Sequence, residues 1–71
     1  MPRKDIRYTK HAMQRKLERG ISDAQISLAL ENPDYTVFRE GRKVAVKRFG
    51  HRIIKVVHKE EGAYILVITV Y

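Results

Sequence analysis

The sequence contains no cysteine, so it forms no disulfide and offers no thiolate chemistry. This composition is compatible with a reducing compartment. The longest apolar run lies within Ala63–Val70, far short of the roughly 20 residues that a transmembrane helix requires. Charged residues begin at Arg3 with no apolar segment behind them, which is not the pattern of a secretory signal peptide. We therefore expect a cytoplasmic protein without a membrane span.

Common cofactor and catalytic motifs are also absent. The sequence has no P-loop, no dinucleotide-binding glycine motif and no nucleophile elbow. Its histidines, His11, His51 and His58, lack the short spacings of metal ligands, and no carboxylate cluster accompanies them. We expect no metal and no cofactor. We assign His51 to a surface turn and His58 to a structural position on the apolar face of a strand.

The chain does carry a large excess of positive charge. Lysine and arginine number 15 against 8 acidic residues, which gives a net charge of +7 and a pI near 10.1. The cations concentrate in Arg3–Arg19 and Arg39–Lys59, whereas Gly20–Asp34 has none. A field of this sign attracts polyanions such as nucleic acids, and the uneven distribution favours a binding face. The alternative is a solvated surface that keeps a small protein in solution.

Two helices are predicted in the first half of the chain. Thr9 is an N-cap for a helix that runs to about Arg19 and stops at Gly20. The segment Ser22–Gln25 has the pattern of a capping box and opens a second helix. That helix ends at Asn32–Pro33, because the residue before proline avoids the helical region.

The second half of the chain changes to the two-residue period of strands. The strand candidates are Tyr35–Arg39, Lys43–Phe49, Arg52–His58 and Ala63–Tyr71. The short turns between them indicate an antiparallel meander. Residues 1–71 are therefore predicted to form a single small α+β domain, with two N-terminal helices followed by a four-stranded antiparallel sheet.

The first predicted helix carries a basic face. His11, Arg15 and Arg19 follow one another at intervals of four residues, which places an imidazole and two guanidiniums on one side. Met13 and Leu17 form an apolar pair on the other side, which we expect to face the core. The basic face suits an anion such as a phosphodiester. The alternatives are an exposed polar histidine and arginines that only pair with nearby glutamates.

A second basic surface is predicted on the sheet. Ile54 and Val56 are expected in the core, and so are Val44 and Val46, which turns the alternate residues to the opposite face. With matching registers, one open face collects Lys43, Lys47, Lys55, Thr69 and Tyr71. Such a surface fits a phosphate backbone and a stacked base. The alternative is a set of ordinary amphipathic strands with solvated lysines.

Several short motifs resemble those of a known family. They are His11–Ala12, Arg15, Glu18–Ser22, Leu30–Pro33 and Val67–Tyr71. Together they resemble a family of short, mostly uncharacterised prokaryotic domains that is grouped with the barnase–EndoU–colicin–RelE (BECR) superfamily of RNase toxins. The resemblance spans about Thr9 to Tyr71. One departure is Lys16, which stands where many members carry an apolar residue.

The resemblance implies a helix-then-four-strand, BECR/RelE-like fold and metal-independent RNA cleavage through a 2′,3′-cyclic phosphate. It also implies pairing with an antitoxin, here a small acidic protein. Carried over by position, the catalytic residues of that superfamily correspond to His11, Arg15, Thr69 and Tyr71.

These residue types suit the chemistry that the resemblance implies. Metal-free RNA cleavage needs a base for the 2′-OH proton, an acid for the leaving 5′ oxygen and cations around the phosphate. His11 can serve as acid or base, and Arg15 can clamp a phosphate with two hydrogen bonds. Thr69 can hydrogen-bond the phosphate, and Tyr71 can stack a base or act as the acid. The cations expected to bind RNA are Arg19, Lys43, Lys47 and Lys55.

Two other functions fit the same composition. One is a nucleic-acid-binding module without catalysis, which predicts salt-dependent binding and no turnover. The other is a protein-interaction domain whose basic face docks an acidic partner.

Overall fold

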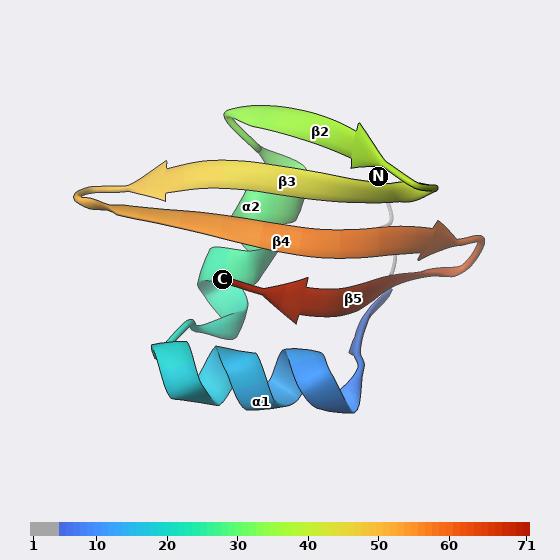
Figure 1. The fold of residues 1–71 in the computed structure, drawn as a ribbon, viewed down its shortest axis with the longest axis horizontal. Helices are drawn as coiled ribbons and strands as arrows, with labels where there is room; N and C mark the ends of the chain where they lie inside the picture. Colours follow the sequence, from blue (N-terminus) through green and yellow to red (C-terminus); the bar gives the residue numbers. More distant parts are fainter. Residues whose placement is uncertain (1–4) are drawn as a thin grey trace.

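The computed structural model describes residues 5–71 and shows one sheet with two helices (Figure 1). Arg3 and Lys4, the start of the first cation-rich segment, lie outside the described residues. The elements in chain order are β1 (Asp5–Tyr8), α1 (Lys10–Arg19), α2 (Asp23–Glu31), β2 (Tyr35–Arg39), β3 (Arg42–Phe49), β4 (Arg52–Glu61) and β5 (Tyr64–Val70). The strands lie in the order β1-β5-β4-β3-β2.

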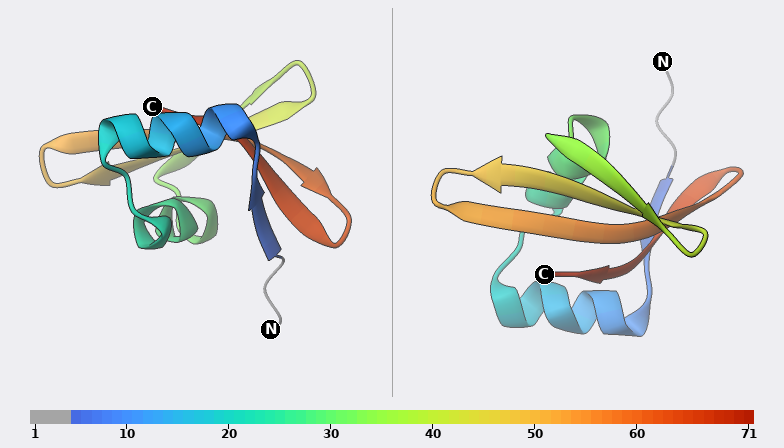
Figure 2. Two further views of the ribbon diagram at one scale, coloured as in Figure 1. Left: turned by 90° about the horizontal axis from the view of Figure 1, so that it is seen from below. Right: turned by 45° about the horizontal axis from the view of Figure 1, so that its top comes forward.

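The helices leave one face of the sheet uncovered. α2 packs on β3 and β4, and α1 lies along β5. Figure 2 shows α2 on one side of the sheet, while the β2–β3 hairpin bends toward the other side. We call this other side the open face, because no helix within residues 5–71 covers it. No helix in that range is long and apolar enough to cross a membrane.

The predicted four-stranded antiparallel sheet is wrong, because a fifth strand precedes both helices. β1 pairs in parallel with β5, from Asp5 opposite Tyr64 to Tyr8 opposite Val67. The sheet is therefore mixed, with five strands. β1 was missed because it has only four residues and two of them are charged, so its sequence resembles a charged tail. Its partner is also distant in the sequence, so no local pattern reveals the pairing.

The predicted helix ends are confirmed. The Thr9 side chain accepts a hydrogen bond from the Ala12 N–H at 3.1 Å, as an N-cap does. Gly20 ends α1 in the left-handed conformation, with φ of 62°. Ser22 and Gln25 form both hydrogen bonds of a capping box at the start of α2.

The predicted core face of α1 is wrong. Met13 is 43% exposed and Leu17 is 73% exposed, whereas Ala12 is fully buried. Ala12 is the α1 residue that joins the buried core cluster, so the core side of α1 is the side of its small residue. Lys16 lies next to the buried side, where its ammonium pairs with Asp23 at the start of α2, at 3.0 Å.

The prediction that Val44 and Val46 of β3 face the core side of the sheet is wrong. The register pairs Ala45 with Val56 and Lys47 with Ile54, so Ala45 is the β3 residue that packs beneath α2. Val44 and Val46 therefore lie on the open face, although each is nearly buried. The buried cluster between helices and sheet comprises Ala12, Ile21, Ile26, Ala29, Ala45, Ile54, Val56, Val67 and Val70.

The observed register removes Lys43 and Lys47 from the open face, contrary to the predicted basic sheet surface. The Lys47 ammonium donates to the carbonyl of Asn32, just after α2, at 2.9 Å. The Lys43 ammonium pairs with Glu60 at 3.0 Å. Lys55 lies on the open face as predicted, since it pairs with Val46.

A bulge in β5 sets the direction of its last side chains. Val57 pairs with Thr69 and His58 pairs with Val67, which leaves Ile68 as an extra residue. Val67 and Val70 consequently both face the core, where both are fully buried. Thr69 is turned to the open face with Val57.

The predicted assignments of two histidines agree with the structure. His51 is exposed in the β3–β4 turn, and His58 is only 6% exposed. The Nδ1 of His58 lies 3.1 Å from the Val56 carbonyl oxygen, so this nitrogen carries the donated proton. Burial lowers the pKa of His58 below its usual 6.5; the Val56 hydrogen bond and Glu60 raise it, and Lys43 lowers it further.

We expect the protein to lose stability as the pH falls below 6.5. Below this value the unfolded chain protonates His58 while the folded protein keeps it neutral, so the proton favours unfolding. Urea unfolding at about pH 7.5 and about pH 5.5 measures the difference. His58→Gln should flatten this pH dependence, and His51→Gln, at an exposed turn, is the matched control. Equal pH dependence in the wild type and His58→Gln would contradict the assignment.

Candidate functional site

The basic face of α1 meets the end of β5 around a cavity of about 290 Å³. We call it the phosphate cavity, because guanidiniums of the kind that line it bind phosphate groups well. All of the predicted catalytic residues border it, together with one predicted RNA-binding residue. The lining residues are His11, Arg15, Arg19, Thr69, Val70 and Tyr71. The structure thus brings together side chains of α1 and of the last strand that are fifty or more positions apart in the sequence.

Thr9 fixes the start of α1 against the bulge in β5. Its backbone N–H donates to the Val67 carbonyl at 3.0 Å, and its hydroxyl donates to the Ile68 carbonyl at 2.7 Å. The same hydroxyl accepts the Ala12 N–H, so a single side chain links the helix cap to the strand. This anchor places His11, two residues later, beside Thr69.

Arg52 holds the other end of α1. Its guanidinium donates to the backbone carbonyls of Arg19 and Gly20, the latter at 3.4 Å. These are carbonyls of the last helical turn, which attract cations. Arg52 was not predicted, because its position at the start of β4 shows no pattern that links it to a helix end. With both ends fixed, α1 presents its basic face in one direction.

Tyr71 extends the sheet by one residue beyond β5. Its N–H donates to the Lys55 carbonyl at 2.9 Å, and its carbonyl accepts the Lys55 N–H at 2.7 Å. The Lys55 ammonium lies 5.5 Å from the centroid of the Tyr71 ring, within range of a cation–π contact. Tyr71 is therefore held by backbone pairing and by a cation on the open face.

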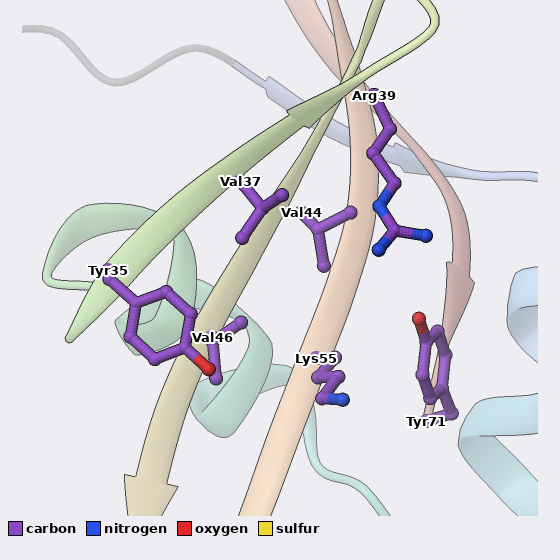
Figure 3. A pocket seen from close by; sticks show the side chains of 7 residues that line it. All are labelled: Tyr35, Val37, Arg39, Val44, Val46, Lys55 and Tyr71. Carbon is purple, nitrogen blue, oxygen red and sulfur yellow. The ribbon is translucent and has the colours of Figure 1, made fainter.

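A second cavity of about 360 Å³ lies on the open face beside the first (Figure 3). We call it the sheet hollow. Tyr71 borders both cavities. The sheet hollow is lined by Tyr35, Val37, Arg39, Val44, Val46, Lys55 and Tyr71. Tyr35 and Arg39 were not predicted as site residues. Their spacing of two residues from Val37 could have indicated that all three side chains share one face of β2.

The charges around the two cavities are cationic. No aspartate or glutamate side chain within residues 5–71 lines either cavity. One lining cation has an acidic contact: the Glu18 carboxylate lies 3.6 Å from the Arg15 guanidinium on the exposed surface of α1. An exposed pair of this kind is weak and leaves Arg15 available to a stronger anion. Lys43 and Lys47 do not join this site.

The donor set offers little to a metal ion. Within the described range, no three histidine, aspartate or glutamate side chains lie close enough to hold one. His11 lies among arginines, a hydroxyl and a phenol, which are hydrogen-bond donors to an anion. The arrangement can bind an oxyanion, and its imidazole can move a proton.

The structure defines a small basic α+β domain with a cationic cavity between its first helix and its last strand. Residues 8–71 match the family described as "Domain of unknown function (DUF4258)", and the chain belongs to this family. Comparisons with curated proteins and with solved structures found no match.

Proposed function

We propose that this protein is a small metal-independent endoribonuclease of the RNase-toxin type. The observation that carries the proposal is the phosphate cavity, where His11 and Arg15 of α1 converge with Thr69 and Tyr71 at the end of β5. A base, cations and hydroxyl donors around one cavity are the groups that metal-free RNA cleavage requires.

The reaction begins at the ribose next to the bound phosphate. Neutral His11 takes the proton of the 2′-OH, and the oxygen attacks phosphorus to form the 2′-O–P bond. The P–O5′ bond breaks, and the Tyr71 hydroxyl protonates the leaving 5′ oxygen. Arg15 and Thr69 hold the non-bridging oxygens, whose charge grows in the transition state. The products are a 2′,3′-cyclic phosphate and a free 5′-OH. His11 then gives its extra proton to water, and the Tyr71 phenolate takes a proton from water.

We also group this family with the BECR superfamily of RNase toxins and assign the protein an acidic antitoxin as its partner. The grouping depends on the site residues, since the five-stranded mixed sheet differs from the fold that the resemblance implied. The net charge of +7 supports an acidic partner, because charge complementarity accelerates association and suppresses wrong partners.

The proposal predicts RNA cleavage by the purified protein in excess EDTA, after any bound partner has been removed. The expected products end in a 2′,3′-cyclic phosphate, which mass spectrometry identifies. A substrate with a single 2′-deoxy nucleotide at the cleaved position is the matched control and should remain intact there. Cleavage that stops in EDTA, or that also occurs at the 2′-deoxy position, would contradict the mechanism. Salt-dependent binding without any turnover would instead favour a non-catalytic binding module.

A further inference from the structure

Of the residues that line the sheet hollow, Tyr71 alone takes part in the proposed cleavage. It lies on the open face, where β2, β3 and β4 meet the residue that follows β5 (Figure 3). We propose that it holds one nucleobase of the bound RNA and selects the keto bases, guanine and uracil. This inference rests on the proposed function, since it assigns the substrate preference of the same site.

The floor and walls of the hollow fit a flat apolar ring. Val44 is 9% exposed and Val46 is 4% exposed, although no helix within residues 5–71 covers them. Tyr35 and Tyr71 rise on opposite sides of this floor and remain about half exposed (Figure 3). A base stacks on aromatic side chains through its π-face, whichever base it is. Stacking therefore explains why a base enters, and the polar rim determines which base is preferred.

The charged rim of the hollow supplies hydrogen-bond donors. Arg39 and Lys55 line it, and neither side chain has an acceptor. Guanine presents O6 and N7 as acceptors, and uracil presents O4, whereas adenine and cytosine present amino groups at the matching positions. An amino group facing a guanidinium places donor against donor. The rim consequently favours the keto bases.

Tyr71 joins the base site to the phosphate cavity. Tyr71 borders both spaces, and Figure 3 shows its hydroxyl directed along the open face toward Arg39. A nucleotide seated in the hollow thus brings its 5′ oxygen toward the hydroxyl that protonates the leaving group. The selected base therefore belongs to the nucleotide on the leaving-group side of the cleaved phosphate.

Binding of uncleavable dinucleotides to the wild-type protein tests this inference. The probes are the 2′-O-methyl forms of UpU, GpG, ApA and CpC, which lack the attacking 2′-OH. Methyl NMR follows Val44 and Val46 on the floor during each titration. We expect UpU and GpG to shift both valines and to bind about tenfold more tightly than ApA and CpC. Equal binding of all four probes, or shifts confined to α1, would overturn the inference.

Two arginine variants distinguish an effect of the hollow's rim on base preference from an effect of positive charge in general. Arg39→Ala should remove most of the keto preference. Arg48→Ala is the matched control, because Arg48 lies on the same face of β3, opposite Ile53, but outside the hollow. Loss of the preference in both variants would overturn the assignment to Arg39. Keto-selective binding by a protein that does not cleave RNA would support the base site and refute the nuclease. RNA cleavage without shifts of the two valines would support the nuclease and refute the base site.

Discussion

The His11→Ala variant is expected to cleave RNA about 10²- to 10⁴-fold more slowly than the wild type, with RNA binding largely retained. His11 borders the phosphate cavity as its one imidazole among the described residues, so no neighbouring side chain there replaces it as a base near neutral pH. Arg15 and Arg19 remain to hold the phosphate. The loss should consequently appear in the rate of the bound complex rather than in the affinity.

Single-turnover cleavage at saturating protein measures this rate directly. His51→Ala is the matched control, since it removes an exposed histidine from the β3–β4 turn, away from the cavity. A His11→Ala protein that is folded and cleaves at the wild-type rate would exclude His11 as the base.

The candidate site was predictable because its parts lie on regular local patterns. The four-residue spacing of His11, Arg15 and Arg19 specifies one helix face wherever the helix packs. Thr69 and Tyr71 keep a shared face because they lie two residues apart, beyond the bulge. What could not be predicted was their meeting in space, since it depends on the Thr9 anchor to a strand at the other end of the chain.

The errors in the fold have a different physical origin. Sequence patterns rank apolar residues by size, which favoured Met13 and Leu17 in α1 and Val44 and Val46 in β3. The structure buries Ala12 and Ala45 against the neighbouring layer instead, because small side chains allow helix and sheet to approach closely. When a strand has apolar residues on both faces, its sequence does not define which face is buried. The prediction therefore assigned the wrong face of β3 to the core.

That wrong assignment also explains why the sheet hollow was not predicted. With Val44 and Val46 assigned to the core, the open face held only lysines and two residues of the last strand. The observed register gives that face an apolar floor and adds Tyr35 and Arg39 from β2. The register thus changes a charged surface into a lined cavity.

The second large effect is expected at Thr9, which joins the fold to the site. Thr9→Val keeps the shape of the side chain but removes the hydroxyl. The variant loses the N-cap of α1, and it leaves the partly buried Ile68 carbonyl without its donor. These two losses together should lower the free energy of unfolding by about 2–3 kcal/mol. Urea denaturation at neutral pH measures this change.

Two further variants isolate the hydroxyl. Thr36→Val makes the same substitution on exposed β2 and should leave stability within about 0.5 kcal/mol of the wild type. Thr9→Ser retains an oxygen at the cap and should recover most of the loss. A Thr9→Val protein as stable as Thr36→Val would show that the cap and the Ile68 hydrogen bond carry little energy.

The same substitution also tests whether the anchor positions the site. Under conditions where Thr9→Val stays folded, α1 lacks its hydroxyl tie to the bulge, so His11 is held less firmly beside Thr69. Cleavage should therefore fall by more than the folded fraction explains, because small displacements of a catalytic group have large costs. Thr9→Ser should restore the rate together with the stability. Full activity in folded Thr9→Val would mean that the backbone hydrogen bond from Thr9 to Val67, Arg52 and the packing of Ala12 hold the helix in place without the hydroxyl.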